Sequence, residues 1–430
     1  MTNILSPQPY KGTRDYYPAD KRVQNYIFET WRRVVERFGY EEYGAPLLES
    51  LDVYAAKSGT ELVNEQTYSF TDRGGRSVAI RPEMTPSISR MVAAKRQELA
   101  YPARFYSIAN FMRYERPQRG REREFWQLNV DIFGADSVAA DSEIITIADA
   151  ILKEFGATPA DYIIRVNNRS FIHAMMAEYL GLSNEAEYAM IKLFDRRNKI
   201  SEAAFIDQAR DILGEKQQNE LEKVQAIINA TSIEALPDEL QKNPAVAEIH
   251  EVLQSVRALG VTSAIFDATL MRGLDYYTGT VFEVFDTHPE NSRALFGGGR
   301  YDGLVGLFGA EPLSAVGMAP GSTMIENFLQ VHNLLPTVTP KTDVYIVVIG
   351  SVTLEAQQLA QLLRAAGVNT EVDVTGRKFD KQLKTALKKE IPYLLFVGPD
   401  DIARNQYSLK NSETEHEETL SPEEIIEKLQ

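Results

Sequence analysis

Five arginines crowd one short stretch of this sequence, FMRYERPQRGREREFWQLNVDIFG at residues 111–134. They lie at the end of one predicted strand, in a loop with Pro and Gly, and at the start of a second predicted strand: Arg113, Arg116, Arg119, Arg121 and Arg123. Guanidinium groups bind phosphate oxygens through short, charge-assisted hydrogen bonds. The stretch therefore predicts a site that grips a polyphosphate, and the common alternative for a charge run is an exposed, salt-bridged hairpin.

The second predicted strand carries a row of polar groups on one face. Side chains alternate between the two faces of a strand, which places five residues on the same side: Arg123, Phe125, Gln127, Asn129 and Asp131. The opposite side is mostly apolar and is expected to face the core. An ordered row of arginine, aromatic, amide and carboxylate groups predicts the floor of a binding site.

Four further blocks accompany this stretch along the chain. They are KGTRDYYP at 11–18, IRPEMTPSISR at 80–90, MRGLDYYTGTVFE at 271–283 and GGGRYDGLV at 297–305. In wording and order the set resembles the histidyl-tRNA synthetases, which are class II aminoacyl-tRNA synthetases, and residues 111–134 resemble motif 2 of that class. The resemblance is close over the catalytic region, whereas the rest of the chain matches mainly in size and pattern.

The resemblance implies a reaction in which ATP activates L-histidine, pyrophosphate leaves, and histidine is transferred to histidine tRNA. Such chemistry needs cations on the phosphates and polar groups on the amino acid. Arg113 resembles the motif 2 arginine that bridges the α-phosphate and the carboxylate. Arg272 resembles an arginine that supplies charge where related enzymes place a metal, and its alternative is a buried ion pair with Asp275 or Glu283.

The rest of the ATP site is assigned by the resemblance to the motif 2 hairpin. Glu115 would face the adenine amino group, and Phe125 would stack on the ring. Arg121 and Arg123 would lie near the outer phosphates, with a structural salt bridge as an equal alternative for Arg123. ATP is expected with Mg²⁺. A structural metal held by the protein is not expected, because there are no cysteines and the five histidines are scattered.

Two groups of residues are expected to hold histidine. Glu83 and Thr85 match residues that bind the α-amino group, and Gln127 would share this task. Asp131 and Tyr277 are candidates for reading the imidazole ring, whose two nitrogens need a matched donor and acceptor. Asp131 is one methylene shorter than the glutamate common in bacterial relatives.

Several positions near these blocks have two interpretations. Tyr276 and Tyr301 could line the histidine pocket or pack in the core, as tyrosines at strand spacing often do. The glycines at 297–299 allow either a close approach of backbone to substrate or a tight turn. Met324 stands where class II motif 3 should present an arginine, which predicts an unusual ATP site.

The elements that position these residues can be predicted in outline. Residues 21–40 have apolar side chains at helical spacing, and residues 104–114 and 123–132 form two extended segments of a hairpin. Residues 1–332 are therefore predicted to form an α+β catalytic domain on an antiparallel sheet, of the class II synthetase kind, with a helical insertion at about 155–260.

A linker with two prolines, at 333–341, is expected to lead to a small, mostly parallel α/β domain at 342–430, because strands and helices alternate there. This domain resembles the anticodon-binding domains of class IIa synthetases. Lys381, Lys384 and Lys388 fall on one face of a predicted helix. They are candidates for binding tRNA backbone phosphates, and a merely solvated face explains them equally well.

The composition limits the kind of partner. A formal net charge of −15 argues against a protein that coats nucleic acid without specificity. The first residues lack the pattern of a secretion signal, and no apolar stretch is long enough for a membrane span, so we expect a cytoplasmic protein. Pro46 resembles the motif 1 proline at the class II dimer interface, and the resemblance therefore implies a homodimer.

The resemblance leaves a second function open, that of a catalytically silent paralogue acting as regulatory subunit of ATP phosphoribosyltransferase. Such relatives usually lack the final α/β domain and degrade the RGLDYYTG block. This chain keeps both features. We therefore expect ligase activity, the charging of tRNA with histidine.

Overall fold

The computed structural model describes residues 5–55, 65–197, 200–214, 217–271 and 276–430. Contacts divide the chain into two units. The first consists of residues 1–15 and 24–335, and the second of residues 16–23 and 336–430. No helix in the described ranges is both long enough and apolar enough to cross a membrane.

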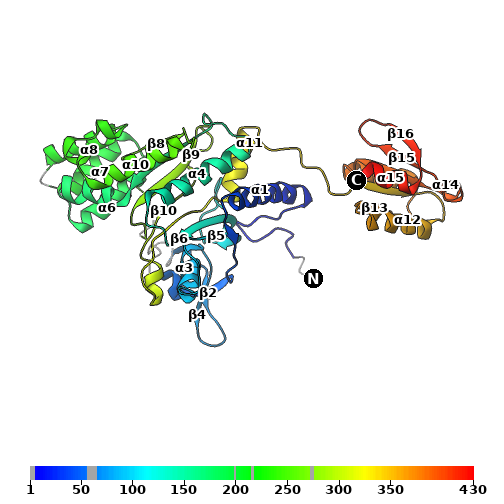
Figure 1. Ribbon diagram of the computed structural model, residues 1–430, viewed down its shortest axis with the longest axis horizontal. Coiled ribbons are helices and arrows are strands. Elements are labelled where there is room, and N and C mark those ends of the chain that lie inside the picture. The colour runs from blue at the N-terminus through cyan, green and yellow to red at the C-terminus, as the bar shows by residue number, and fades with distance from the viewer. Residues whose placement is uncertain (1–4, 56–64, 198–199, 215–216, 272–275) are drawn as a thin grey trace. The chain divides into compact units, whose positions relative to one another are not determined.

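The first unit is built on an eight-stranded, mainly antiparallel sheet (Figure 1). Only the outermost pairs, β1 with β5 and β7 with β8, are parallel. In spatial order the strands are β1 (Glu41–Glu42), β5 (Ala103–Met112), β6 (Glu124–Phe133), β11 (Ala315–Met318), β10 (Ala294–Arg300), β9 (Thr280–Asp286), β7 (Tyr162–Asn168) and β8 (Ala264–Phe266). The predicted α+β domain on an antiparallel sheet is confirmed.

The central hairpin of this sheet joins β5 and β6 in unbroken register, from Ala103 opposite Phe133 to Met112 opposite Glu124. Both strands begin and end within two residues of the predicted segments. The expected open polar face exists only at the start of β6, because its last six residues are all buried. Asn129 and Asp131 are therefore enclosed, whereas Phe125 and Gln127 stay partly exposed.

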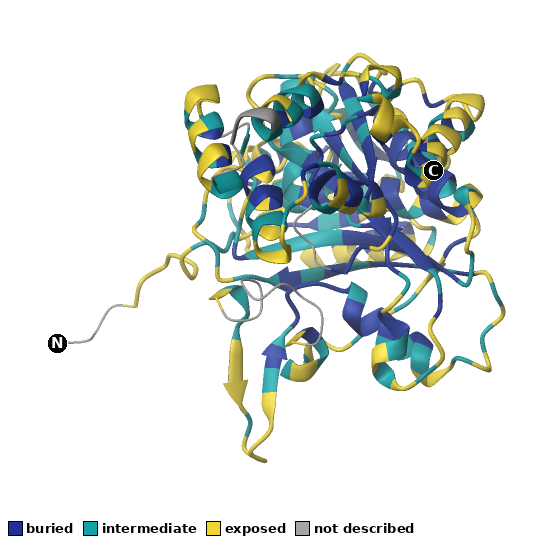
Figure 2. Cartoon of the chain, turned by 90° about the vertical axis from the view of Figure 1, so that its left-hand side faces the viewer, coloured by how far each residue is buried: buried dark blue, intermediate teal, exposed yellow. Residues whose placement is uncertain are grey.

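Helices cover the sheet and bury its apolar side chains (Figure 2). Helix α1 (Pro18–Arg37) places Phe28 against Trp126 of β6, with 5.3 Å between the ring centroids. Helix α4 (Val138–Glu154) packs on β11 and on α10 (Pro244–Ala258), and α11 (Ser322–Val331) packs on β6. The predicted helix at 21–40 is confirmed, with bounds shifted by about three residues at each end.

A second, three-stranded antiparallel sheet lies in the first unit, in the order β2-β4-β3. Its strands are β2 (Leu48–Ser50), β4 (Ser77–Ile80) and β3 (Ser69–Thr71), accompanied by α2 (Leu51–Ala55) and α3 (Thr85–Ala94). All three residues of β3 are exposed, and Figure 2 shows this hairpin reaching away from the buried sheet. Helix α3 begins in the RPEMTP block and so fixes the position of Thr85.

The region predicted as a helical insertion, 155–260, contains a strand of the main sheet. Strand β7 pairs antiparallel with β9, so the helices beyond it form the actual excursion from the sheet. These are α5 (Arg169–His173), a π-helical turn at Ala174–Tyr179, α6 (Asn184–Asp195), α7 (Glu202–Leu213), α8 (Gln217–Asn229) and α9 (Asp238–Gln241). Helical patterns flank the seven residues of β7 on both sides, and for this reason the strand was not predicted from the sequence.

The second unit is a five-stranded sheet in the order β13-β12-β14-β15-β16. Strands β13 (Thr370–Val372), β12 (Val344–Val348) and β14 (Tyr393–Val397) are parallel, as predicted. The helices are α12 (Thr353–Ala365), α13 (Phe379–Lys388), α14 (Pro399–Arg404) and α15 (Pro422–Leu429). Strands β15 (Tyr407–Asn411) and β16 (Glu417–Leu420) add an antiparallel hairpin that was not predicted from the sequence.

Candidate functional site

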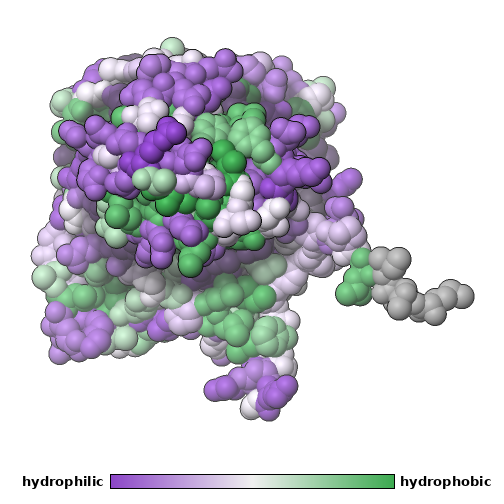
Figure 3. Space-filling model, turned by 90° about the vertical axis from the view of Figure 1, so that its right-hand side faces the viewer, coloured by the Kyte–Doolittle hydropathy of each residue, from purple (hydrophilic) through white to green (hydrophobic). Residues whose placement is uncertain are grey.

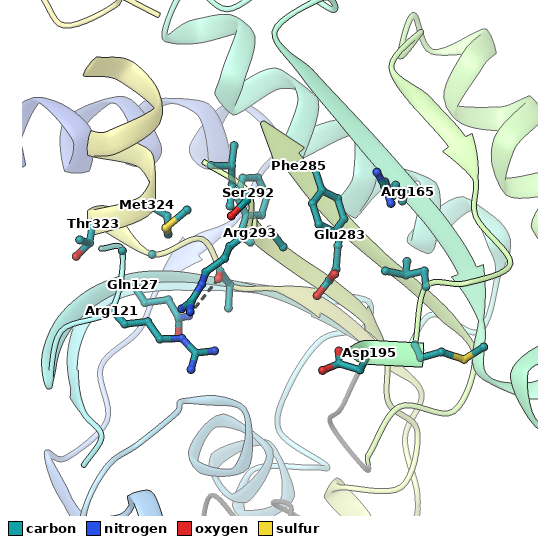
Figure 4. Close-up of a pocket in the computed structure, with 18 of the residues that line it drawn as sticks. Arg121, Gln127, Arg165, Asp195, Glu283, Phe285, Ser292, Arg293, Thr323 and Met324 are labelled. Carbon is teal, nitrogen blue, oxygen red and sulfur yellow. Dashed lines mark hydrogen bonds between the residues drawn. The ribbon is translucent and has the colours of Figure 1, made fainter. Parts of the chain in front are cut away.

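A cavity of about 650 Å³ opens where the loop after β5, strand β9, the start of β10 and the start of α11 come together (Figure 4). Five of the residues expected from the sequence line it: Arg113, Glu115, Arg121, Phe125 and Gln127. Met324 also lines it. The residues predicted to bind the nucleotide and Met324, at the motif 3 arginine position, therefore line the same cavity.

Arg113 is held firmly at the end of β5. Its Nε donates to the carbonyl oxygen of Pro82 at 2.8 Å, and its guanidinium lies 5.2 Å from the ring centroid of Phe125. The Phe125 ring stacks in turn on Phe111 at 5.7 Å. Neither Nη group has a hydrogen-bond partner among the described residues, so both remain available to a ligand.

Arg121 and Glu115 form an ion pair in the cavity wall, with 3.1 Å between Nη1 and Oε2. The Arg121 side chain is 51% exposed and that of Glu115 only 12%. A nucleotide that used both groups would therefore have to replace this pair.

Arg123 points away from the cavity, although the sequence placed it beside the outer phosphates. It is buried, its Nη1 donates to the Tyr10 hydroxyl at 2.9 Å, and its guanidinium lies 4.1 Å from the ring centroid of Tyr114. Its backbone N–H donates to the carbonyl of Gly12 in the KGTRDYYP block. This geometry favours a structural role, built from aromatic rings and hydrogen bonds rather than the salt bridge considered as the alternative.

The turn of the motif 2 loop packs directly on Met324. Gly120 has φ +76°, and a Cβ at this position would overlap the Met324 sulfur. Gln127, at the floor, donates from Nε2 to the carbonyl of Ala319 at 3.1 Å. The glycine of RPQRG is thus required both for its backbone conformation and for the close approach to α11.

The residues expected to read histidine form a separate, buried cluster that does not line the cavity. The Tyr276 hydroxyl donates to Glu83 at 3.2 Å, and the Tyr276 ring lies 5.0 Å from Tyr277 and 5.8 Å from Tyr301. The Tyr301 hydroxyl donates to Asp131. Both carboxylates, Glu83 and Asp131, are at most 5% exposed.

Asp131 has an unusual environment for a carboxylate. Burial raises its pKa to about 7, and the hydrogen bond from Tyr301 opposes this shift only in part. Its Oδ2 has no hydrogen-bond partner within the described ranges. Tyr43 lies close enough for the Asp131 charge to raise its pKa further, beyond the effect of burial, and its hydroxyl is also unpartnered there. No sequence pattern pointed to Tyr43.

Glycines on β10 and β11 make room for this cluster. A Cβ on Gly299 would lie 2.8 Å from the Tyr277 ring, and one on Gly317 would overlap the Asp131 carboxylate. Residues 297–299 belong to strand β10, so they form no tight turn. Their small size serves close packing between strands and against Tyr277.

Two arginines that the sequence did not single out have clear positions. Arg300 is buried and pairs with Asp141 of α4 at 2.7 Å, which joins the GGGRYDG block to that helix. Arg293 lines the cavity, where Figure 4 shows it extending toward Arg121. Both lie beside glycine-rich strand sequence, and only the fold reveals their neighbours.

The remaining expected residues fall into three groups. Arg272 falls outside the described residues, so its role stays a prediction. Thr85 begins α3, two residues after Glu83, and does not line the cavity. In the second unit, the three lysines of α13 are exposed: Lys381, Lys384 and Lys388.

The face of α13 opposite these lysines is only partly buried. Ala386 and Leu383 pack in a small core, whereas Phe379 and Leu387 are 42% and 49% exposed. The Phe379 ring stacks on Phe396 of β14 at 5.9 Å. The helix therefore presents both cations and apolar groups to solvent.

Two family models match the chain. The model described as histidyl-tRNA synthetase matches residues 12–323, and the one described as anticodon binding domain matches residues 343–430. The histidine–tRNA ligase of Leptospira biflexa serovar Patoc is 40% identical to this chain over 429 residues. That match covers 99% of this chain and 98% of the relative.

Solved structures have the same fold. A histidyl-tRNA synthetase from Nostoc sp. PCC 7120 has a TM-score of 0.82 at 24% identity and covers 99% of both chains. An ATP phosphoribosyltransferase regulatory subunit/histidyl-tRNA synthetase from Bacillus halodurans has a TM-score of 0.74 at 22% identity, over 90% of this chain and 97% of that one. Since the first family model spans well over half of the sequence and the Leptospira relative matches over nearly its whole length, this chain belongs to the histidyl-tRNA synthetase family.

Proposed function

We propose that this chain is a histidine–tRNA ligase, which activates L-histidine with ATP and transfers it to the 3′ end of histidine tRNA. The observation that carries this proposal is the 40% identity to a ligase over nearly the full length of both chains. The cavity supports it, because arginines, an aromatic ring and an amide from the motif 2 hairpin line one space.

In the first step, a histidine carboxylate oxygen would bond to the α-phosphorus of ATP, and the bond from that phosphorus to the bridging oxygen would break. Pyrophosphate leaves. Arg113 is suited to this step, because Pro82 and Phe125 fix its guanidinium while its Nη groups stay available. Fixed donors aimed at developing charge stabilise a transition state without reorganisation. Arg272 would add a second cation there.

The adenine ring would lie on Phe125, with its amino group toward Glu115. Arg121 would then exchange the Glu115 carboxylate for a phosphate oxygen. This exchange replaces one charge-assisted contact by another, so its net cost is small. Arg123 has no direct part in this arrangement.

Magnesium would accompany ATP and compensate part of the phosphate charge. An octahedral magnesium ion bound through phosphates needs only one or two carboxylates from the protein. Glu122 and Glu283 line the cavity and are oxygen ligands of the required kind. All other positioning of the nucleotide falls to the arginines, Phe125 and Glu115.

Histidine would lie between the cavity and the buried cluster. Gln127 and Asp131 stand four residues apart on the same side of β6 and so connect the two places. The unpartnered oxygen of Asp131 offers an acceptor for an imidazole N–H, and Tyr277 lies beside Tyr276 in the same cluster. Glu83 and Thr85 would hold the α-amino group.

The tRNA would use both units. In the second step, the terminal ribose hydroxyl attacks the activated carbonyl carbon and AMP leaves. The exposed lysines of α13 would contact backbone phosphates of the anticodon stem: Lys381, Lys384 and Lys388. We also propose a homodimer, acting in the cytoplasm where translation consumes the product. Exposed Leu47, Leu48 and Phe70 on the small sheet near Pro46 support the dimer.

The silent regulatory paralogue is the weaker candidate. The Leptospira relative, which matches this chain over nearly the full length of both, is a ligase, whereas the Bacillus halodurans structure, at 22% identity, shows a shared fold alone. The match of residues 343–430 to an anticodon binding domain also favours a protein that binds tRNA.

Exchange of labelled pyrophosphate into ATP, measured with each of the twenty amino acids, tests the proposal. We expect exchange with histidine alone. Purified chain that binds ATP but shows no exchange with any amino acid would instead establish the regulatory paralogue.

A further inference from the structure

Arg293 is a cavity residue that belongs to none of the sequence blocks. It immediately precedes β10 and lines the cavity together with Arg121 and Met324. Figure 4 shows its side chain reaching across the cavity toward Arg121 and Gln127. Its position brings a second guanidinium to the part of the cavity where Met324 contributes no charge.

A hydrogen bond to a neutral side chain holds Arg293 in place. Its Nη2 donates to Oε1 of Gln118 in the motif 2 loop at 2.8 Å. Close by, Arg119 of the same loop pairs with Glu290 at 2.8 Å. Residues 290–293 and the motif 2 loop are thus tied together at two points.

Arg293 differs from Arg121 and Arg165, two other arginines of the cavity, because it has no carboxylate partner among the described residues. Arg121 pairs with Glu115, and Arg165 pairs with Asp267 at 3.0 Å. Within the described ranges no carboxylate lies at ion-pair distance from Arg293. Its Nη1 is buried and has no hydrogen-bond partner there. An enclosed, unsatisfied N–H of a cation is costly unless an anion completes it.

The neighbourhood of Arg293 is electropositive. Burial, and then the positive charge of Arg121, lower the pKa of Arg293. Arginine nevertheless stays charged in proteins, so two like charges face one space. Such an arrangement is unfavourable in the empty cavity and becomes favourable when a polyanion enters.

We propose that Arg293 binds the outer phosphates of ATP and supplies the positive charge that motif 3 lacks at Met324. This inference rests on the proposed function, because it assumes that the cavity holds ATP. Arg113 serves the α-phosphate, which leaves the β- and γ-phosphates to Arg121 and Arg293. The segment just before β10 thus takes over the phosphate-binding task of motif 3.

A purely structural role is the competing explanation, since Arg293 also docks the motif 2 loop. The two roles predict different changes in affinity for ligands with and without outer phosphates. Loss of docking would disturb Arg113, Phe125 and the α-phosphate as well, whereas loss of a phosphate contact affects only ligands that carry outer phosphates.

The test compares Arg293→Gln with wild type and with Glu290→Gln, which breaks the neighbouring tie between loop and segment but leaves Arg293 intact. Pyrophosphate exchange gives the KM values for ATP and histidine. Calorimetry in the presence of Mg²⁺ gives the affinities for ATP and AMP. We expect Arg293→Gln to weaken ATP about 10- to 100-fold, the value of a charge-assisted contact, with AMP and histidine changed less than about threefold.

The control should leave all four values within about threefold of wild type. The inference is overturned if Arg293→Gln weakens ATP and AMP equally, or if it has no larger effect than Glu290→Gln. If Arg293→Gln does not fold, Arg293→Lys replaces it in the test. Lysine keeps the positive charge but lacks the planar guanidinium with its paired donors, so the affinity for ATP should still fall more than the affinity for AMP. If the wild-type protein shows no pyrophosphate exchange with histidine, the proposed function is wrong. The comparison of ATP with AMP binding would still decide the role of Arg293.

Discussion

At the scale of single residues, Asp131, which we propose reads the imidazole ring, comes at a cost to the stability of the fold. Its carboxylate is buried, and one of its oxygens has no partner among the described residues. An imidazole N–H of bound histidine would donate a hydrogen bond to that oxygen. The carboxylate would then have a partner in the bound state that it lacks in the free state. Residues placed for a ligand are often unfavourable in its absence.

Asp131→Asn should reduce histidine affinity far more than ATP affinity. The amide can offer its N–H₂ group where the imidazole N–H needs an acceptor, and a site built for a hydrogen bond discriminates strongly when the pairing fails. We expect the KM for histidine to rise about 100-fold or more, with the KM for ATP nearly unchanged. Pyrophosphate exchange measures both, and equal losses for the two substrates would remove Asp131 from the specificity role.

The same substitution should stabilise the protein at high pH. In the folded chain the Asp131 pKa is raised to about 7, so between about pH 4 and pH 7 the folded state holds a proton that the unfolded state releases. Stability is therefore lost as the pH rises through this window, and Asn removes that loss. Without histidine, Asp131→Asn should be more stable than wild type at pH 8, by on the order of 1–4 kcal/mol.

Thermal unfolding at pH 5 and pH 8 checks this expectation. The gain in Tm of Asp131→Asn over wild type should be larger at pH 8. A gain of the same size at both pH values would mean that the Asp131 carboxylate does not titrate in this range.

At the scale of elements, the sequence predicted what short-range patterns encode. The β5–β6 hairpin, α1 and the parallel part of the second sheet follow from periodicity and turn residues. Strand β7 was missed, because its partner β9 lies more than a hundred residues away and helical patterns flank it. Arg293 was missed for the same reason: its neighbours Gln118 and Arg121 are distant in sequence.

The motif 2 loop depends on Gly120 for its contact with α11. In Gly120→Ala the added methyl would overlap the Met324 sulfur and the backbone would keep an unfavourable positive φ. We expect the loop to shift and the KM for ATP to rise several-fold, with a loss of about 1 kcal/mol in stability from the backbone alone.

Gly75→Ala is the matched control for the backbone cost. Gly75 has φ +78°, close to that of Gly120, and a Cβ there would meet no atom within 4 Å. It should lose a similar amount of stability without any change in the KM for ATP. Adding Met324→Ala to Gly120→Ala should restore part of the ATP affinity by making room. If Gly120→Ala behaves as Gly75→Ala does, the contact between the loop and α11 has no role in ATP binding.

At the scale of the whole molecule, an acidic chain has to bind a polyanion. The formal net charge is −15, and the face shown in Figure 3 is largely hydrophilic with smaller apolar areas. Cations must therefore be grouped where tRNA makes contact, which also disfavours other RNAs. Helical spacing in the sequence identifies the lysines of α13. It does not reveal that Phe379 and Leu387, on the opposite face of the helix, remain exposed.

Replacing the three lysines of α13 by alanine should separate tRNA charging from histidine activation. Pyrophosphate exchange involves no tRNA and should be unchanged, whereas the KM for tRNA should rise. Each phosphate contact contributes about 0.7–0.9 to the slope of log affinity against log salt, so the slope should become shallower by about two to three when three contacts are lost. Filter binding of histidine tRNA at several salt concentrations measures it. The substituted positions are Lys381, Lys384 and Lys388.

A control variant of the same unit removes exposed cations from other helices, with Arg404→Ala on α14 and Lys428→Ala on α15. Both variants shift the net charge in the same direction, so a general electrostatic effect would weaken tRNA binding in both. A specific site on α13 predicts a loss of slope only in the lysine variant, because contacts with phosphate are local while the charge of the whole protein is screened beyond about 10 Å. If the salt dependence of tRNA binding has the same slope in the lysine variant and in wild type, these lysines do not contact tRNA. The contact would then have to lie on another face of the second unit.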